Sequence, residues 1–274
     1  MASSDTKTQL RKGGTMAGFK DVFQRIEVKY LLNDTQYTEL MKRLEGMAAI
    51  DSYGETSILN IYFDTPDFKL IERSLEKPKY KEKLRLRTYG VAKDDTNAFI
   101  EIKKKYAGVV YKRRISMPYA QAIDYLVNGN NPPQESQISK EIDYFLKYYK
   151  GIKPAMAISY DRIAMAGISD PDLRITFDRN IRWRTNNLSL SEGNVGKDIL
   201  LPGQHLMELK IAGAMSMELA RILDELNIRK ISFSKYGRGY LEYMYGQTNE
   251  MIMKGIVPEQ KKEKSKVEVF RKAV

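Results

Sequence analysis

Three short segments of the chain repeat the pattern glutamate, apolar residue, lysine. They are Glu27-Val28-Lys29, Glu101-Ile102-Lys103 and Glu208-Leu209-Lys210, and each lies in a run of alternating polar and apolar residues. Because alternation with a period of two is typical of a β-strand, each glutamate should share one face of a sheet with its lysine. Carboxylate oxygens suit a hard divalent cation, and ammonium groups suit phosphate.

Two further alternating runs carry only cations on their polar side. The run Lys81–Arg87 would place four cations on one strand face, and the run Val110–Ser116 would place Lys112 and Arg114 on one face of another strand. A register shift of one residue would exchange Lys112 for Arg113. A sheet face with this many cations is suited to a polyanion.

Composition limits the other kinds of chemistry. The 274 residues have a net charge of +11, no cysteine and a single histidine, His205. Disulfides, thiolate metal sites and most imidazole chemistry are therefore not expected, and the absence of cysteine fits a reducing compartment. No segment approaches the ~18 to 20 apolar residues that span a bilayer, and the N-terminus lacks a signal-like apolar stretch. We predict a soluble, cytoplasmic protein.

Charge alone does not choose among nucleic acid, a membrane surface and phosphorylated small molecules. The cationic strands show no pair of aromatic residues of the kind that stacks on bases, so we expect no nucleic-acid partner. A P-loop nucleotide site is also not expected, because no Gly-x-x-x-x-Gly-Lys-Ser/Thr motif occurs.

The chain should form one domain with an additional segment at each end. We expect a polar leader at residues 1–18, which is disordered or artificially added and contains Met16 as an alternative start. The domain should occupy residues 19–250, and a basic, lysine-rich tail should occupy residues 251–274. The length of the chain is enough for a single large hydrophobic core or two modest ones.

The positions of apolar residues predict the elements of this domain. Alternation predicts strands near residues 24–32, 57–63, 81–89, 98–106, 108–117, 154–164, 172–184 and 204–211. Helical spacing predicts a helix behind an Asp34 cap, a second after Pro118, a third around Ile142 and a fourth around Leu223. No glycine-rich turn opens a helix, and strands and helices do not alternate regularly, so a doubly wound parallel sheet is not expected.

The two faces of the strands differ in character. Apolar residues can pack under the helices, whereas the charged residues either meet bulk water or line the interior of a closed barrel. One such strand would favour the solvent interpretation. Repetition over five strands favours the barrel, because a flat face of like charges repels itself, whereas phosphates would compensate a charged interior.

Eight sequence motifs, taken in order, resemble the VTC domain, the polyphosphate polymerase branch of the triphosphate tunnel metalloenzymes. The motifs cover residues 19–245 and are Glu27–Lys29, Tyr62–Asp67, Arg85–Gly90, Phe99–Lys103, Tyr160–Arg162, Leu173–Asp178, Met207–Lys210 and Ser232–Tyr236. The resemblance implies an α+β fold: a closed eight-stranded antiparallel β-barrel tunnel with flanking helices. It also implies that the tunnel binds ATP and inorganic polyphosphate with Mn²⁺ or Mg²⁺.

The resemblance carries a set of site residues onto this sequence. As catalytic cations it implies Lys29, Arg85, Arg87, Lys103, Arg162, Arg174, Lys210 and Lys235. As further substrate-binding residues it implies Arg25, Lys112, Arg114, Tyr160 and Ser234. The family's last motif usually reads Lys-x-Ser-Lys; here Ser232 takes the first lysine position and Lys230 lies two residues earlier.

The acidic residues are predicted to have several different roles. Glu208 is the first choice of metal ligand, and Glu27 and Glu101 could either join it or form ion pairs between strands. Asp178 is expected to be a structural acceptor and Asp64 a turn former. His205 should lie on the strand face opposite to Glu208, so we expect it to pack or to be exposed.

One departure from the wider superfamily favours a polymerase. Its hydrolases and cyclases have a Glu-x-Glu-x-Lys pattern, and Arg25 stands here at the first glutamate. A hydrolase must activate water, whereas the end of a polyphosphate chain is already an anionic nucleophile. We therefore expect transfer of the ATP γ-phosphate to polyphosphate. A tunnel triphosphatase and a non-catalytic polyphosphate or inositol-phosphate binding module stay open, and a separate membrane-associated subunit could be a partner.

Overall fold

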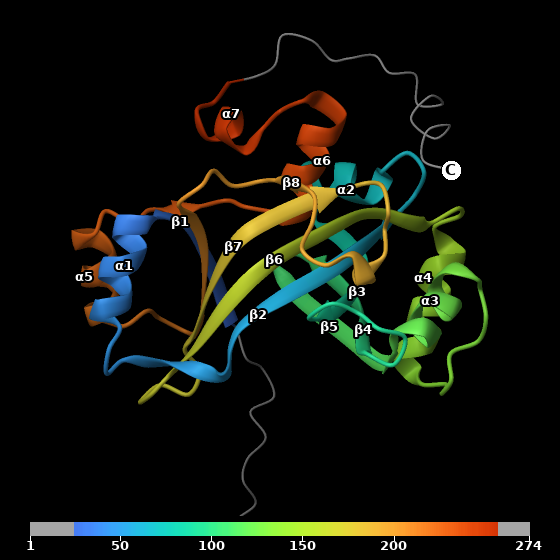
Figure 1. Ribbon diagram of the computed structural model, residues 1–274, viewed down its shortest axis with the longest axis horizontal. Coiled ribbons are helices and arrows are strands. Elements are labelled where there is room, and N and C mark those ends of the chain that lie inside the picture. Colours follow the sequence, from blue (N-terminus) through green and yellow to red (C-terminus); the bar gives the residue numbers. More distant parts are fainter. Residues whose placement is uncertain (1–24, 257–274) are drawn as a thin grey trace, which may run out of the picture.

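A computed structural model describes residues 25–256, and its centre is one strongly curved antiparallel sheet (Figure 1). The strand order is β10-β1-β9-β7-β6-β2-β3-β4-β5, with β8 paired to β7. The strands are β1 (Arg25–Asn33), β2 (Ala48–Asp64), β3 (Tyr80–Tyr89), β4 (Asn97–Tyr106), β5 (Val109–Pro118), β6 (Lys153–Gly167), β7 (Arg174–Arg184), β8 (Lys197–Asp198), β9 (Gln204–Ala212) and β10 (Lys230–Ile231).

All eight predicted strands are present, with two differences. The short β8 and β10 were not predicted, and β2 begins at Ala48 rather than near residue 57. The added part of β2 includes a register shift between Ile50 and Glu55, and its residues are largely exposed. Alternation of apolar residues is weak there, so the sequence indicated only the buried half of the strand.

Seven helices surround the sheet within residues 25–256. They are α1 (Asp34–Arg43), α2 (Lys69–Leu75), α3 (Tyr119–Val127), α4 (Gln137–Tyr148), α5 (Met217–Glu225), α6 (Lys235–Tyr245) and α7 (Asn249–Met253). The four predicted helices correspond to α1, α3, α4 and α5, whereas α2, α6 and α7 were not predicted. The cap of α1 is Asn33 and not Asp34, because the Asn33 side chain accepts from the Gln36 backbone amide while the Gln36 side chain accepts from that of Asn33.

Two apolar clusters cover the outer face of the sheet. Ile61, Leu86 and Ile100 from β2, β3 and β4 pack with α3 and α4, and Leu32 and Leu209 from β1 and β9 belong to a second cluster with α1 and α5. Figure 1 shows these helix pairs at opposite sides of the sheet. The apolar strand residues are therefore buried under helices, which leaves the opposite face of the sheet to the charged residues.

A third apolar cluster holds α6 and α2 against β2, β6 and β7. Tyr236 on α6 stacks on Tyr62 of β2 with 4.5 Å between ring centroids, and Tyr240 is buried beside it. Close approach depends on Gly239, because a Cβ there would lie 2.8 Å from the Met156 sulfur and 3.1 Å from the Trp183 Cβ. This packing brings the first turn of α6 over the charged face.

The α+β architecture, with a large antiparallel sheet and flanking helices, is confirmed. In the hydrogen-bonding order of residues 25–256, β10 and β5 are the two ends of the sheet, so the closed eight-stranded barrel is not part of that order. The predicted leader at residues 1–18 lies outside the described residues, as does most of the predicted tail. The predicted boundary at residue 250 falls within α7. None of the helices in the described part of the chain is long and apolar enough to cross a membrane.

Candidate functional site

The register of the sheet places the predicted cations and acids on one face, which we call the charged face. Directly paired residues of neighbouring strands point to the same side of a sheet. The pairs on the charged face include Lys29 with Glu208, Glu27 with Lys210, Arg174 with Lys210, Arg162 with Asp178, Arg85 with Glu101, Glu101 with Arg114, and Lys103 with Lys112.

The same register shows which of Lys112 and Arg113 lies on the charged face. Lys112 points to the charged face, where its Nζ lies 2.9 Å from the Glu101 Oε1. Arg113 points to the outer face, where its Nε lies 3.9 Å from Glu141 on α4. Arg114 shares the face of Lys112, and its guanidinium lies over the Phe99 ring at 5.0 Å from the centroid.

One group of cations surrounds Glu101, which is 2% exposed. The Arg85 Nε and Nη2 each lie 2.6 Å from its Oε2, and the Arg87 Nη1 lies 3.8 Å away. Burial opposes ionisation of this carboxyl, but Arg85, Arg87 and Lys112 together lower its pKa to about 2. Arg87 is itself buried and donates to Asn60, which fixes its direction. Glu101 is therefore placed as the counterion of this group.

A second group surrounds Glu208 and Asp178. The Lys235 Nζ lies 2.5 Å from Asp178 and 3.0 Å from the Glu208 Oε1, and the Lys29 Nζ lies 3.4 Å from the same Oε1. Arg162 donates to both oxygens of Asp178, at 2.5 and 2.7 Å. Burial opposes ionisation of Glu208, but Lys235, Lys29 and Arg162 hold its pKa well below the usual range. Asp178 is a structural acceptor, as predicted.

The start of α6 positions Lys235 in this second group. Ser234 caps the helix by accepting from the Gly237 backbone amide at 3.2 Å. The Lys235 Nζ then lies 4.6 Å from the centroid of the Tyr160 ring, and the Arg162 guanidinium lies 5.2 Å from the same ring. Tyr160 is therefore a buried aromatic platform for two cations, in addition to the 3.5 Å contact between its hydroxyl and Arg87.

The remaining predicted cations are more exposed. Arg174 donates to the backbone carbonyls of Pro171 and Leu173, and Lys210 and Lys103 form no ion pair within residues 25–256. Arg25 is paired in register with Ala212, but its side chain lies outside the described residues. The structure thus brings Lys29, Arg85, Arg87, Lys112, Arg162 and Lys235 into ion-pair networks with acids and leaves the other cations of the charged face around them.

Lys230 does not supply the cation that the family motif has at the position of Ser232. Lys230 lies on β10 opposite Tyr30, which packs in the outer apolar cluster, so Lys230 is exposed on the outer face. The Lys29 Nζ instead donates to the Phe233 carbonyl at 3.1 Å. One cation that the family motif implies is therefore missing from the charged face.

Three residues of the charged face were not predicted as site residues. Tyr62 accepts from the Arg85 Nη1 at 3.1 Å, and the Lys83 Nζ lies over the Tyr236 ring at 5.7 Å from its centroid. Burial, together with repulsion from neighbouring lysines, lowers the pKa of Lys83 to about 8. Burial opposes ionisation of Tyr62, but Arg85 and Lys83 lower its pKa to about 8. The alternation of Lys81–Arg87 already placed Lys83 on this face and was the available signal.

Two other predictions concern residues outside the site. His205 packs on the outer face: its ring stacks on Tyr37 at 4.1 Å and its Nε2 lies 2.7 Å from an Asp34 oxygen, so the prediction of packing is confirmed. Asp64 is buried and accepts from the backbone amides of Leu70 and Ile71 and from the Tyr236 hydroxyl. It therefore fixes the start of α2 and also ties α2 to α6.

One carboxylate oxygen of the charged face fits a divalent cation. Among residues 25–256, no group of three or more acidic, histidine or cysteine side chains is arranged to hold a metal. The Glu208 Oε2, however, accepts no hydrogen bond from a described residue, and the Arg162 Nη2 lies 3.9 Å from it. Because Mg²⁺ and Mn²⁺ often take one or two carboxylates plus phosphate oxygens and water, this oxygen fits such an ion. Glu27 forms an ion pair with Lys29 at 3.5 Å.

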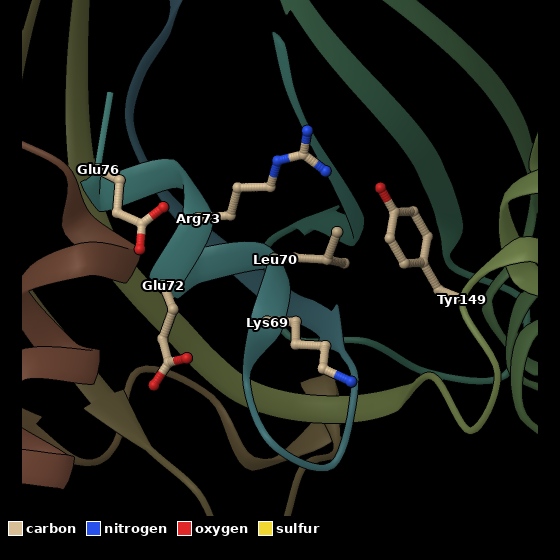
Figure 2. A pocket seen from close by; sticks show the side chains of 6 residues that line it. All are labelled: Lys69, Leu70, Glu72, Arg73, Glu76 and Tyr149. Carbon is tan, nitrogen blue, oxygen red and sulfur yellow. The ribbon is translucent and has the colours of Figure 1, made fainter. Parts of the chain in front are cut away.

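A pocket of about 320 Å³ lies elsewhere, between α2 and Tyr149 (Figure 2). Lys69, Leu70, Glu72 and Arg73 of α2 line it, together with Glu76 directly after the helix. Glu72 accepts from the Tyr240 hydroxyl at 2.6 Å and so supports the contact between α2 and α6. None of the predicted site residues lines this pocket, so the chemistry of the charged face is separate from it.

Comparisons with known proteins agree with this geometry. The model of the VTC domain family matches residues 24–244. No curated protein sequence matches the chain. A candidate adenylyl cyclase from Hippeastrum, described as having a dominant triphosphatase activity, is 14% identical, with 79% of this chain and 95% of that chain covered and a TM-score of 0.51.

Two further solved structures have lower TM-scores. A candidate adenylate cyclase from Bacillus halodurans is 17% identical, with 77% and 93% of the two chains covered and a TM-score of 0.47. The capping enzyme triphosphatase of Mimivirus is 10% identical, with 76% and 88% covered and a TM-score of 0.33. At these identities a likeness concerns the fold alone.

Proposed function

The chain belongs to the VTC domain family, and from this premise we propose that it is a polyphosphate polymerase that uses ATP. The observation that supports the proposal most is the charged face itself. Guanidinium and ammonium groups of Arg85, Arg87, Arg162 and Lys235 converge on it, each held in direction by an acid, an amide or an aromatic ring. Such pre-oriented cations suit the transfer of a phosphoryl group, in which negative charge must be neutralised.

The proposed reaction moves one phosphoryl group. A terminal oxygen of the polyphosphate chain attacks the γ-phosphorus of ATP and forms a new P–O–P bond. The bond between the γ-phosphorus and the oxygen that bridges it to the β-phosphate breaks, and ADP leaves with the electron pair. Because the attacking oxygen is already anionic, no general base is required. Arg85, Arg87 and Arg162 would hold donor and acceptor in line through bidentate contacts to phosphate oxygens.

Mn²⁺ or Mg²⁺ is part of the proposal. Glu208 would hold the ion through Oε2, with Glu27 as a second carboxylate, and Glu101 would stay the counterion of Arg85. When bound, such an ion neutralises charge on the phosphate oxygens and fixes their geometry. Lys235 and Lys29 position Glu208 for this role, because both nitrogens lie within 3.4 Å of its other oxygen.

We also propose that the curved sheet closes into a tunnel around the charged face. In support, charged side chains on one strand alter the pKa of lysines on strands that are not its neighbours in the sheet. Glu27 on β1 favours the charged form of Lys103 on β4, and Lys29 on β1 disfavours the charged form of Lys83 on β3. Lys103 is also exposed to water, and charges on β1, β2 and β3 all act on its pKa. A side chain that lines a water-filled channel would combine these two properties.

The acids of the charged face favour the polymerase over a hydrolase. Neighbouring lysines and arginines lower the pKa of Glu101 to about 2 and hold the pKa of Glu208 well below the usual range, which weakens both carboxylates as bases for water. Arg25 adds a cation where hydrolases have an acid. A triphosphatase is the second candidate, since the Hippeastrum structure with a related fold is described as having that activity.

Product analysis tests the proposal. The purified protein would be incubated with γ-labelled ATP and Mn²⁺, with and without a short polyphosphate primer, and products would be separated on a gel. We expect a ladder of labelled chains with one ADP per added phosphate, and loss of the ladder in the Glu208→Ala variant. Labelled orthophosphate alone would establish the triphosphatase. Tight polyphosphate binding without turnover, unchanged in Glu208→Ala, would establish a binding module.

A further inference from the structure

One hairpin of the sheet ends in an apolar tip between two groups of cations. Strands β4 and β5 meet at the sequence Tyr106-Ala107-Gly108-Val109-Val110-Tyr111, whose side chains carry no polar group apart from the tyrosine hydroxyls. Three cations precede this run and three follow it: Lys103, Lys104, Lys105, Lys112, Arg113 and Arg114. No aspartate or glutamate occurs from residue 102 to residue 123, so the local charge is strongly positive. We call residues 103–114 the hairpin end.

The tip of the hairpin end is not covered by the rest of the described chain. Every residue from 105 to 114 is exposed, on both faces of the two strands. Tyr106, Val109 and Tyr111 point to the outer face and are 59%, 51% and 54% exposed, and Val110 points to the charged face and is 47% exposed. Single exposed apolar residues are ordinary on a protein surface, whereas a contiguous group of them marks an interaction site.

The turn of the hairpin stays apolar against the preference of its backbone. Ala107 and Gly108 are its two central residues, with φ of 46° and 91°. Positive φ at both positions is typical of a type I′ turn, for which asparagine, aspartate or glycine is the usual first residue. Alanine is strained there, because its Cβ lies too close to the following carbonyl oxygen. The Ala107 backbone amide donates to the Lys79 carbonyl at 2.9 Å, which fixes the turn beside a further exposed cation.

The cations around the tip are only partly compensated. Lys104 and Arg113 on the outer face share one carboxylate, that of Glu141, at 3.5 and 3.9 Å. No ion pair among residues 25–256 includes Lys79 or Lys105, and both side chains are exposed. The hairpin end is therefore suited to a partner that offers negative charge around an apolar interior.

The surface of an anionic lipid bilayer offers both properties together. Its headgroups attract lysine and arginine, and tyrosine rings favour the boundary between headgroups and acyl chains. A tip that is exposed on both faces enters such a surface without a shaped partner, and it forms no groove that would hold a peptide. A second copy of the chain is disfavoured, because two hairpin ends in contact would bring like charges together.

We propose that the hairpin end binds the surface of an anionic membrane, with Tyr106, Val109 and Tyr111 entering the boundary between the lipid headgroups and the acyl chains. Lys79 and Lys105 contact the anionic headgroups around the tip. The contact is peripheral and reversible, so it needs no membrane-spanning helix. The inference is independent of the proposed reaction, in which none of these five residues takes part.

Sedimentation with vesicles tests the inference. The purified full chain would be mixed with vesicles of phosphatidylcholine that contain about one quarter phosphatidylserine, and separately with vesicles of phosphatidylcholine alone. We expect binding to the anionic vesicles at low salt and about tenfold weaker binding to the neutral ones. Added salt should weaken the binding to the anionic vesicles, because it screens the exposed lysines.

Two matched variants separate the tip from other exposed apolar residues. Val109→Thr/Val110→Thr keeps the size and the β-branching of both side chains and adds a hydroxyl to each. Ile50→Thr/Ile168→Thr is the control, because these residues are exposed to a similar degree, 48% and 58%, at the paired ends of β2 and β6. We expect the tip variant to bind anionic vesicles about tenfold more weakly than the parent and the control to bind like the parent.

A third variant, Ala107→Asn, adds a readout of folding. Asparagine accepts a positive φ more readily than alanine, so the melting temperature should equal or exceed that of the parent. The affinity for anionic vesicles should nevertheless fall, because the side chain at the tip has become polar.

Three results would overturn the inference: a parent that binds no vesicles, equal binding to anionic and neutral vesicles, or the same loss of affinity in the tip variant and in the control. Sedimentation velocity without lipid examines the other occupant of the tip. A dimer of the parent that dissociates in Val109→Thr/Val110→Thr would assign the tip to a second copy of the chain and would also overturn the inference.

Discussion

Replacing Glu101 by glutamine should destabilise the fold strongly, because it removes the counterion of three cations. Glu101 is 2% exposed and lies within 4 Å of nitrogens of Arg85, Arg87 and Lys112. The fall of its pKa from 4.5 to about 2 corresponds to a contribution of about 3 kcal/mol to the free energy of unfolding. That magnitude matches the ~3–5 kcal/mol typical of breaking a buried ion pair.

The loss of stability in Glu101→Gln should depend on pH, because it arises from the charge of the Glu101 carboxylate. The folded-state pKa of Glu101 lies below its unfolded value, so its contribution is fully present above about pH 4.5 and is lost as the pH falls toward about 2. The difference in stability between the parent and Glu101→Gln should therefore be largest at neutral pH and should shrink below pH 4.5. For a domain of this size, ~3 kcal/mol lowers the melting temperature by roughly 6 to 12 °C.

The assay is urea unfolding followed by circular dichroism at several pH values. Glu141→Gln is the matched control, because Glu141 serves cations of the same strands on the outer face at 3.5 and 3.9 Å and is partly exposed. We expect it to cost less than about 1 kcal/mol. If Glu101→Gln were as stable as Glu141→Gln at neutral pH, the assignment of Glu101 as the counterion of the charged face would be refuted.

Two further predictions concern Lys83 and Lys235. Since the pKa of Lys83 is about 8, the affinity for polyphosphate should fall as the pH rises through 8. The affinity of the Lys83→Arg variant in a Tyr62→Phe background should change little between pH 7 and 9, because both groups that titrate near pH 8 are then removed. Calorimetry would measure these affinities, and an affinity that falls as steeply with pH in this variant as in the parent would contradict the prediction. Lys235→Met would leave two buried carboxylates without their shared cation and should cost about 3–5 kcal/mol in urea unfolding, and a loss below about 1 kcal/mol would contradict the assigned role.

The strands and their charged face could be predicted from the sequence because alternation reports directly which side chains share a face. Lys83, Arg85 and Arg87 illustrate this, since their spacing alone placed them together. Partners could not be predicted in the same way. Lys29 meets Glu208 because β1 pairs with β9, and this register depends on contacts between residues far apart in the chain.

Helix α6 shows the other limit. Gly237 and Gly239 lower the helix propensity of its first turns, so local sequence indicates a loop. Tertiary packing overrides this preference, because the absence of a Cβ lets α6 approach Met156 and Trp183. The helix then brings Lys235 between Asp178 and Glu208, a position that no spacing within Ser232–Tyr236 encodes. The local contact of Asp64 with the first turn of α2 is completed by a distant residue, because the Tyr236 hydroxyl on α6 donates to the same carboxylate.

Turnover in ¹⁸O-labelled water tests the central claim most directly, because a polymerase consumes no water and a hydrolase must. The purified protein would be supplied with ATP, Mn²⁺ and a polyphosphate primer. The products would be separated, and their ¹⁸O content would be measured by mass spectrometry. We predict ADP in equal amount to the phosphate added to the chain, with no ¹⁸O in the chain. ADP matched instead by ¹⁸O-labelled orthophosphate would contradict the polymerase and establish a triphosphatase on the same charged face.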